Sequence, residues 1–154
     1  MSATFYIDPI VEAEKYGVNV VADSNIEPVL QNGESGVIEK NKDIITMYIN
    51  PSESLERQRF TIAHELGHYA CGHLDNSTTM FRDGSKEYSR NNYDFQEYEA
   101  NVFAAELLMP KEKIDFLINS KGITTVEELA SILIVSYTAM KIRLQNLGWI
   151  RNYD

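Results

Sequence analysis

The sequence predicts an α+β fold in a single compact domain, with a small β-sheet ahead of a helical C-terminal half. A length of 154 residues suits one domain with a genuine hydrophobic core. Short runs rich in β-branched and aromatic residues occur within the first 50 residues. From about residue 52, apolar residues recur at helical spacing, and Pro or Gly marks the breaks. Strands and helices in separate blocks are typical of the α+β class.

The N-terminal part predicts one helix, a loop and three short strands. Asp8 as the cap and Pro9 in the first turn predict a helix start, and Gly17 a stop. Residues 23–36 are rich in turn formers and predict a loop. The predicted strands are residues 18–22, 37–40 and 44–50, the last two joined by a tight turn at Asn41–Asp43.

After Pro51 the sequence predicts mostly helix. Ser52 is the expected cap of a helix that runs to about Gly72. Residues 74–92 are the least structured by composition, so we expect a mobile connection or a flap over a site. The remaining predicted helices are residues 93–109, 110–120, 124–133 and 136–147.

Composition limits the compartment and the partners. No apolar run approaches the roughly 18 residues of a membrane-spanning helix, and the N-terminus lacks the pattern of a secretory signal. A single cysteine excludes an intrachain disulfide and fits a reducing cytosol. The net charge of −9 works against nonspecific binding to nucleic acid. We therefore expect a cytoplasmic protein without a membrane or nucleic-acid partner.

All three histidines lie in one segment, "FTIAHELGHYACGH". His64 and His68 are four residues apart, so on a helix they lie one turn apart on the same face, with Glu65 beside them. H-E-x-x-H is the zinc-hydrolase pattern, in which two His bind the metal and the Glu acts on its water. The alternative is that these side chains merely pack on an amphipathic helix. The helix is apolar on more than one side, which favours a shared metal because buried polar groups need partners.

A catalytic zinc needs a third protein ligand, and two carboxylates of the helix at 93–109 compete for that role. Glu97 shares an inward stripe with Ala100, Asn101 and Ala104, whereas Glu99 points about 160° away at 100° per residue. Glu97 is therefore the expected ligand, and Glu99 the solvated residue. Asn101 is expected either to hydrogen-bond a metal ligand or to be an ordinary polar residue at a helix contact.

Several residues near the motif have less defined expectations. His73 is five residues beyond His68, so it is expected behind the ligands or in a structural role, and Cys71 is not expected to be a ligand. The strand at 44–50 leads into the motif helix, and its edge would either hold an extended substrate or be a plain sheet edge. Three tyrosines qualify by type and proximity as oxyanion donors, and nothing selects among them: Tyr69, Tyr88 and Tyr93.

The blocks "RFTIAHELGHYACGH", "EYEANVFAAELLMP" and "VSYTAMKIRLQNLGWI" together resemble the ImmA/IrrE-type metallopeptidases of bacteria and their mobile elements, over roughly residues 50–150. The resemblance implies a gluzincin-like fold in which His64, His68 and Glu97 bind one Zn²⁺ and Glu65 is the catalytic base. It also implies a protein substrate, because members typically cleave helix-turn-helix repressors of phage or integrative elements. The chain would then act as an anti-repressor endopeptidase.

The C-terminal segment, about residues 124–150, has the pattern of a helix-turn-helix. Its apolar residues favour packing and its two cations, Lys141 and Arg143, leave DNA contact open. Three functions therefore stand at this point. They are a zinc endopeptidase, a regulator that inactivates a partner repressor by binding alone, and a DNA-binding regulator with a structural metal.

Overall fold

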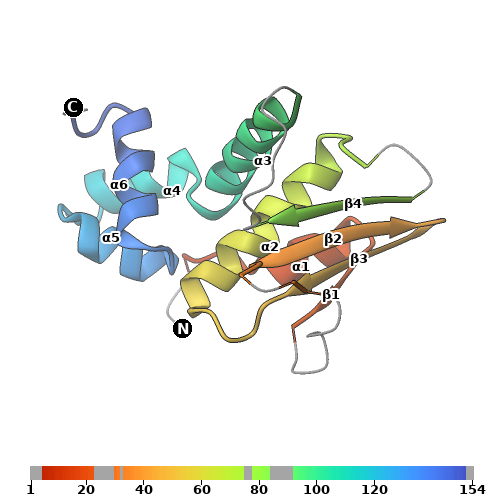
Figure 1. Cartoon of the computed structure of the whole chain (residues 1–154). Helices are drawn as coiled ribbons and strands as arrows, with labels where there is room; N and C mark the ends of the chain where they lie inside the picture. The colour runs from red at the N-terminus through yellow and green to blue at the C-terminus, as the bar shows by residue number, and fades with distance from the viewer. Residues whose placement is uncertain (1–4, 23–29, 32, 75–77, 84–91, 152–154) are drawn as a thin grey trace. The chain divides into compact units, whose positions relative to one another are not determined.

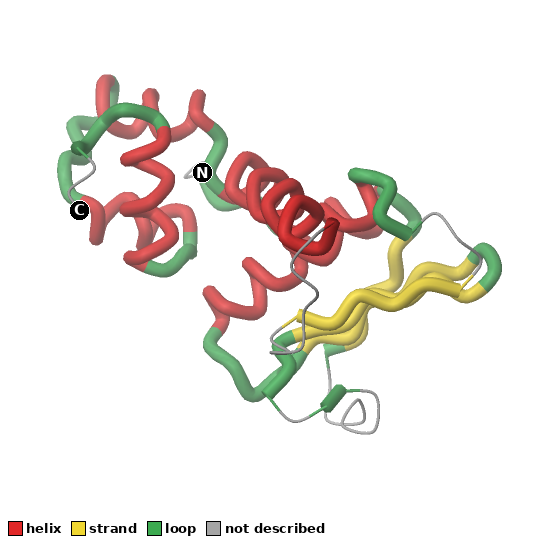
Figure 2. Tube along the Cα trace, turned by 45° about the horizontal axis from the view of Figure 1, so that its top comes forward, coloured by secondary structure: helices red, strands yellow, loops and turns green. Residues whose placement is uncertain are grey.

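The computed structural model describes residues 5–22, 30–31, 33–74, 78–83 and 92–151, and the side chains of 78–83 and 92–94 are outside that description. The described part contains six helices and one four-stranded sheet (Figures 1 and 2). The predicted α+β class is confirmed. The chain divides into two compact units, Asp8–Ala104 and a second that combines Met1–Ile7 with Ala105–Asp154.

The sheet belongs to the Asp8–Ala104 unit and has the strand order β1-β3-β2-β4. β1 (Val18–Val21) pairs parallel with β3 (Ile44–Ile49). β2 (Gly36–Asn41) pairs antiparallel with both β3 and β4 (Thr78–Asp83). The hairpin between β2 and β3 turns where the sequence predicts it, because the paired residues Asn41 and Ile44 leave a two-residue loop.

Two expectations about the strands are wrong. Residues 78–83 form β4 rather than an unstructured connection, because a partner distant in sequence, β2, supplies the backbone hydrogen bonds of this short run. The strand at 44–50 does not form an edge, because β3 has β1 on one side and β2 on the other. The edges of the described sheet are β1 and β4, so the backbone of β3 is not open to a substrate strand.

Helix α2 (Leu55–Ala70) carries the histidine motif and lies against the sheet, where it contacts β2, β3 and β4 (Figure 1). Its cap is Ser54, whose Oγ accepts a hydrogen bond from the backbone N–H of Arg57 at 3.1 Å. The expected cap, Ser52, is wrong: its N–H and its hydroxyl both donate to Asn50 Oδ1 in the turn before the helix.

A glycine lets α2 approach the sheet closely. Gly36 begins β2, and a Cβ placed there would lie 2.6 Å from Thr61 Cγ2 on α2.

The side chains of β3 alternate between buried and more exposed positions, as in a half-buried strand, with Ile45, Met47 and Ile49 buried. Helix α1 (Pro9–Lys15) starts at Asp8 as predicted and packs against α2 and β1.

Helix α3 (Asn92–Leu108) ends close to the predicted position. The second unit continues with α4 (Lys111–Asn119), α5 (Val126–Leu133) and α6 (Tyr137–Asn146). This unit has its own apolar core, built from Leu108, Met109, Ile114, Leu117, Leu129, Leu133, Met140 and Leu144. Among the described residues, no helix combines the length and apolarity needed to cross a membrane.

Candidate metal centre

The three polar residues of the motif are buried on α2, on the side away from solvent. The exposed fractions of His64, Glu65 and His68 are 2%, 0% and 1%. The two imidazole rings are perpendicular, with their centroids 4.8 Å apart, as expected for residues one helical turn apart. Buried polar groups in such numbers are costly unless they interact with one another or with a ligand.

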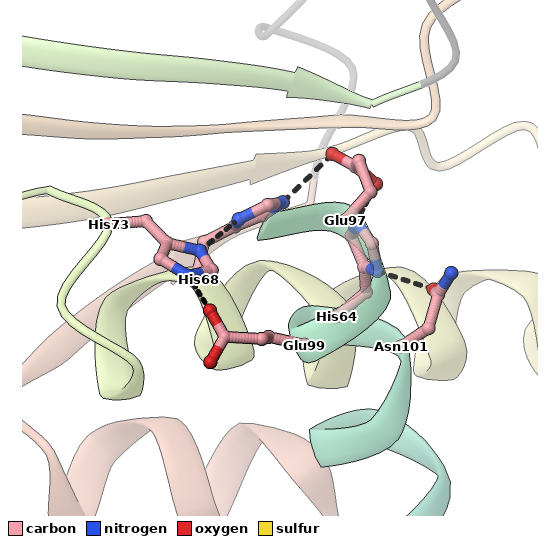
Figure 3. A network of polar contacts seen from close by, with 6 residues as sticks. All are labelled: His64, His68, His73, Glu97, Glu99 and Asn101. Carbon is pink, nitrogen blue, oxygen red and sulfur yellow. Dashed lines mark hydrogen bonds and ion pairs between the residues drawn. The ribbon is translucent and has the colours of Figure 1, made fainter. Parts of the chain in front are cut away.

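Glu97, from α3, meets both histidines. Its Oε2 lies 2.9 Å from His64 Nε2 and its Oε1 lies 3.0 Å from His68 Nε2 (Figure 3). Of the two carboxylates that compete in the sequence, Glu97 is thus the one that reaches the motif. The close packing of α3 on α2 permits this, because Gly67 has no side chain to collide with Ala100.

Proton counting at His64 reveals why a cation fits here. Asn101 Oδ1 lies 2.8 Å from His64 Nδ1, and an amide oxygen can only accept, so Nδ1 carries the proton. The Nε2 atom of a neutral His64 then faces the Glu97 carboxylate lone pair to lone pair, at 2.9 Å. Such a contact requires a proton or a metal ion between the two atoms.

The donor set matches zinc. Two imidazole nitrogens and a carboxylate are the ligands of many catalytic zinc sites, which leave the fourth position to water. Ligand atoms of a tetrahedral site with bonds of ~2.0–2.1 Å lie about 3.3 Å apart, close to the separations seen here. The donor atoms of His64, Glu65 and His68 also lie within 4.8 Å of one another. The residues present therefore fit the metal.

Local electrostatics favour the protonation states that bind metal. Burial alone would raise the pKa of Glu97, but the hydrogen bonds and charges of His64 and His68 outweigh it and hold that pKa well below its ordinary value. Burial lowers the pKa of His68, and this effect exceeds the opposing hydrogen bond to Glu97. The two directions favour the forms that bind metal, an ionised Glu97 and a neutral His68.

The structure also places the residues behind the ligands. His73 Nδ1 lies 2.8 Å from His68 Nδ1, and His73 Nε2 lies 2.9 Å from Glu99 Oε1 (Figure 3). Glu99, the residue expected to be solvated, is 37% exposed and in addition contacts His73. Gly72, with φ +80°, turns the chain back after α2 ends, so His73 meets α3 from a direction that a helical wheel does not represent.

The structure leaves the three tyrosines undistinguished. Tyr69 is half-buried on α2, one residue beyond His68. Tyr93 belongs to α3, but its side chain is outside the described part of the chain, and Tyr88 lies outside the described residues altogether. Cys71, the residue at the C-terminal cap of α2, is exposed.

Comparison with known proteins places this chain in a family. Residues 13–145 match the family described as the IrrE N-terminal-like domain, Peptidase_M78. The chain is 27% identical to Metallopeptidase ImmA of Bacillus subtilis (strain 168) over 118 residues, which cover 77% of this chain and 67% of that protein. Since the family match spans most of the chain, the resemblance seen in the sequence is confirmed: the chain belongs to the Peptidase_M78 family of ImmA/IrrE-type metallopeptidases.

Proposed function

We propose that this chain is a zinc-dependent endopeptidase that cleaves a protein substrate. The observation that carries the proposal is that Glu97, from α3, lies 2.9 Å and 3.0 Å from the Nε2 atoms of the two histidines of H-E-x-x-H on α2. Membership in a metallopeptidase family and the name of the B. subtilis relative support the same reaction. In this proposal His64, His68 and Glu97 hold one Zn²⁺.

The residues of the chain divide the chemistry among them. Bound zinc would lower the pKa of a water and polarise the scissile carbonyl. Glu65, fully buried beside both histidines, takes the proton of the attacking water and later delivers it to the leaving amine. Asn101 accepts the Nδ1 proton of His64 and so keeps that ring in the form that binds metal.

The proposed substrate is a helix-turn-helix repressor, which would make the chain an anti-repressor of a phage or mobile element. Support comes from the three sequence blocks that resemble ImmA/IrrE-type metallopeptidases, whose members typically cleave such repressors. The name of the B. subtilis relative supports the reaction and says nothing of the substrate. A repressor encoded beside the gene for this chain is the substrate to test first. We assign this protein substrate, rather than DNA, to the site.

The C-terminal helices fit a packing role better than DNA recognition. On α6, Met140 and Leu144 are buried in the core of their unit. Arg143, one of the two cations of α6, donates from Nε to the backbone carbonyl of Met109 at 2.9 Å. This bond ties the Arg143 side chain to its own unit through one of its five N–H donors, and α6 has no cation besides Arg143 and Lys141, which is a weak electrostatic basis for DNA binding.

The decisive experiment compares wild type with Glu65→Gln, incubated with the neighbouring repressor and one equivalent of zinc. We expect Glu65→Gln to keep zinc but to cleave roughly 10²–10⁴-fold more slowly, the usual loss for a proton-transfer group. Glu106→Gln, an exposed carboxylate on α3, is the matched control and should cleave normally. Fragments are identified by mass spectrometry.

Each rival function has its own result. If Glu65→Gln cleaves as fast as wild type, Glu65 is not the base. Stoichiometric inactivation of the repressor that survives Glu65→Gln, without fragments, would replace the protease by a binding regulator. Tight, salt-sensitive binding to the operator DNA would favour the DNA-binding protein.

A further inference from the structure

A third histidine lies behind the site, although the H-E-x-x-H motif does not include it. The side chain of His73 is 5% exposed and stands between His68 and Glu99. With Glu97, these residues form a continuous chain of contacts, Glu99–His73–His68–Glu97, with separations of 2.9, 2.8 and 3.0 Å (Figure 3). Both nitrogens of this buried imidazole thus have a polar contact, which offsets the cost of burying it.

With Glu99 ionised and His73 neutral, this chain of contacts assigns a proton to each link. An ionised Glu99 can only accept, so His73 donates from Nε2. A neutral imidazole has one N–H, and His73 Nδ1 therefore presents a lone pair to His68 Nδ1. Since one proton must lie between these two nitrogens, His68 supplies it from Nδ1. The remaining nitrogen, His68 Nε2, then turns its lone pair toward the position between itself and Glu97.

We infer that Glu99 and His73 are positioning residues that hold His68 in the Nδ1–H tautomer, with Nε2 ready to bind the metal. The inference rests on the proposed function, because it concerns a ligand of the same zinc. Asn101 performs the equivalent task for His64 with a neutral amide. At His68 the same task falls to His73, which is held in turn by the carboxylate of Glu99.

The rival explanation is a second cation. The donor atoms of Cys71, His73 and Glu99 lie within 4.8 Å of one another. If His73 Nε2 bound a cation, the proton of His73 would move to Nδ1 and His68 Nδ1 would have to accept it. His68 would then carry its proton on Nε2, facing Glu97, and could not bind zinc there. The two arrangements therefore exclude each other while both imidazoles are neutral.

Zinc stoichiometry and affinity separate the two. Wild type, His73→Phe, Glu99→Ala and Cys71→Ala are titrated with zinc against a competing chelator. We expect the wild-type chain to bind one zinc. The zinc affinity of His73→Phe and of Glu99→Ala should fall by roughly 10–100-fold, as for other groups behind a metal ligand. The zinc affinity of Cys71→Ala should not change. Glu99→Gln restores most of the affinity, because its amide oxygen still accepts from His73 Nε2.

A spectroscopic readout tests the contact between His68 and His73 directly. In ¹⁵N NMR spectra of the zinc-loaded protein, the Nδ1–H proton of His68 should be hydrogen-bonded to His73 and slow to exchange in wild type, and should exchange faster in His73→Phe. Circular dichroism and thermal unfolding identify any variant that loses its fold, and Glu99→Ala, at a position 37% exposed, is the safer change. Neither measurement needs a substrate.

The outcomes distinguish this inference from the proposed function. Loss of zinc affinity in Cys71→Ala, whether of the first or of a second ion per chain, would overturn the positioning role in favour of a cation at Cys71, His73 and Glu99. Full zinc affinity in both His73→Phe and Glu99→Ala would also overturn it, with the peptidase proposal intact. A wild-type chain that binds no zinc would instead remove the proposed function itself.

Discussion

Gly67→Ala tests the close packing of α2 and α3, on which the meeting of Glu97 with the two histidines depends. Gly67 lies between His64 and His68 on α2, and a Cβ placed there would be 3.0 Å from Ala100 O, 3.1 Å from Ala100 Cα and 3.1 Å from Phe103 Cβ. Such distances are tighter than ordinary contacts, so α3 would have to give by a few tenths of an ångström.

The magnitude follows from two opposing effects. Alanine in a helix interior is favoured over glycine by ~0.8–1.0 kcal/mol. Overpacking a close contact costs about 1–3 kcal/mol. The difference predicts that Gly67→Ala lowers the free energy of unfolding by roughly 0–2 kcal/mol, although helix propensity alone would raise it.

Zinc binding should respond more strongly than stability. A metal site tolerates about ±0.2 Å in its ligand distances, and the displacement of α3 moves Glu97 by a comparable amount. We expect zinc affinity to fall about tenfold, which corresponds to ~1.4 kcal/mol. The assay pairs urea unfolding of the metal-free protein with chelator competition for zinc.

Ala70→Gly is the matched control for this experiment. Ala70 is exposed in the last turn of the same helix, so the reverse change should cost up to about 1 kcal/mol of helix propensity without affecting zinc. If Gly67→Ala instead stabilises the protein by the full ~1 kcal/mol of propensity and binds zinc as tightly as wild type, the two helices do not approach as closely as argued.

Two further predictions concern the hairpin and the pH dependence of the site. Lys42 is the first residue of the two-residue turn between β2 and β3 and has φ +56°. Lys42→Gly should raise the free energy of unfolding by about 0.5 kcal/mol, because relief of ~1–2 kcal/mol of left-handed strain exceeds the entropy cost of glycine. A lower free energy of unfolding in urea would contradict the positive φ of Lys42. Zinc affinity should decrease as the pH is lowered, because protons compete with zinc for the imidazoles. Since burial lowers the pKa of His68, this loss of affinity should begin below the ordinary histidine pKa of about 6.5. Chelator titrations that show the loss already above pH 7 would refute this.

Local sequence signals predict the helices well. Asp8 caps α1, and the cap of α6 is Ser136, the residue where its predicted helix begins. The same rule chose Ser52 instead of Ser54 before α2, since both serines have the chemistry of a cap. What decides between them is Asn50, whose side chain binds Ser52 in the preceding turn. The sequence therefore predicts the position of a helix cap to within a residue or two, but it does not predict the turn that competes for the same serine.

Pairing between distant strands is where the sequence is least informative. The run 78–83 becomes a strand only because β2 offers an edge about forty residues earlier in the chain. The parallel pairing of β1 with β3 is equally non-local, and it moves β3 from the edge to the interior of the sheet. Neither pairing leaves a local signature, because the hydrogen-bond partners are set by the tertiary fold.

The candidate site likewise combines contacts that the local sequence predicts with contacts that it does not predict. Helical spacing brings His64 beside His68, and the inward stripe of α3 selects Glu97 over Glu99. The link from Glu99 to His73 escapes that reasoning, because His73 lies beyond the helix and Gly72 redirects it. A glycine followed by a histidine just after a metal-binding helix was the available signal.

Two glycines, Gly36 on β2 and Gly67 on α2, determine where this site can form. At 100° per residue, Thr61 and Gly67 lie about 60° to either side of His64 around α2. Thr61 faces the sheet at Gly36, and Gly67 faces α3 at Ala100. His64 therefore points into the angle between the sheet and α3, and each wall of that angle is brought close by a glycine. A larger side chain at Gly67 would push α3 and its Glu97 away from the histidines, and one at Gly36 would push α2 away from the sheet, so both glycines help to define the site.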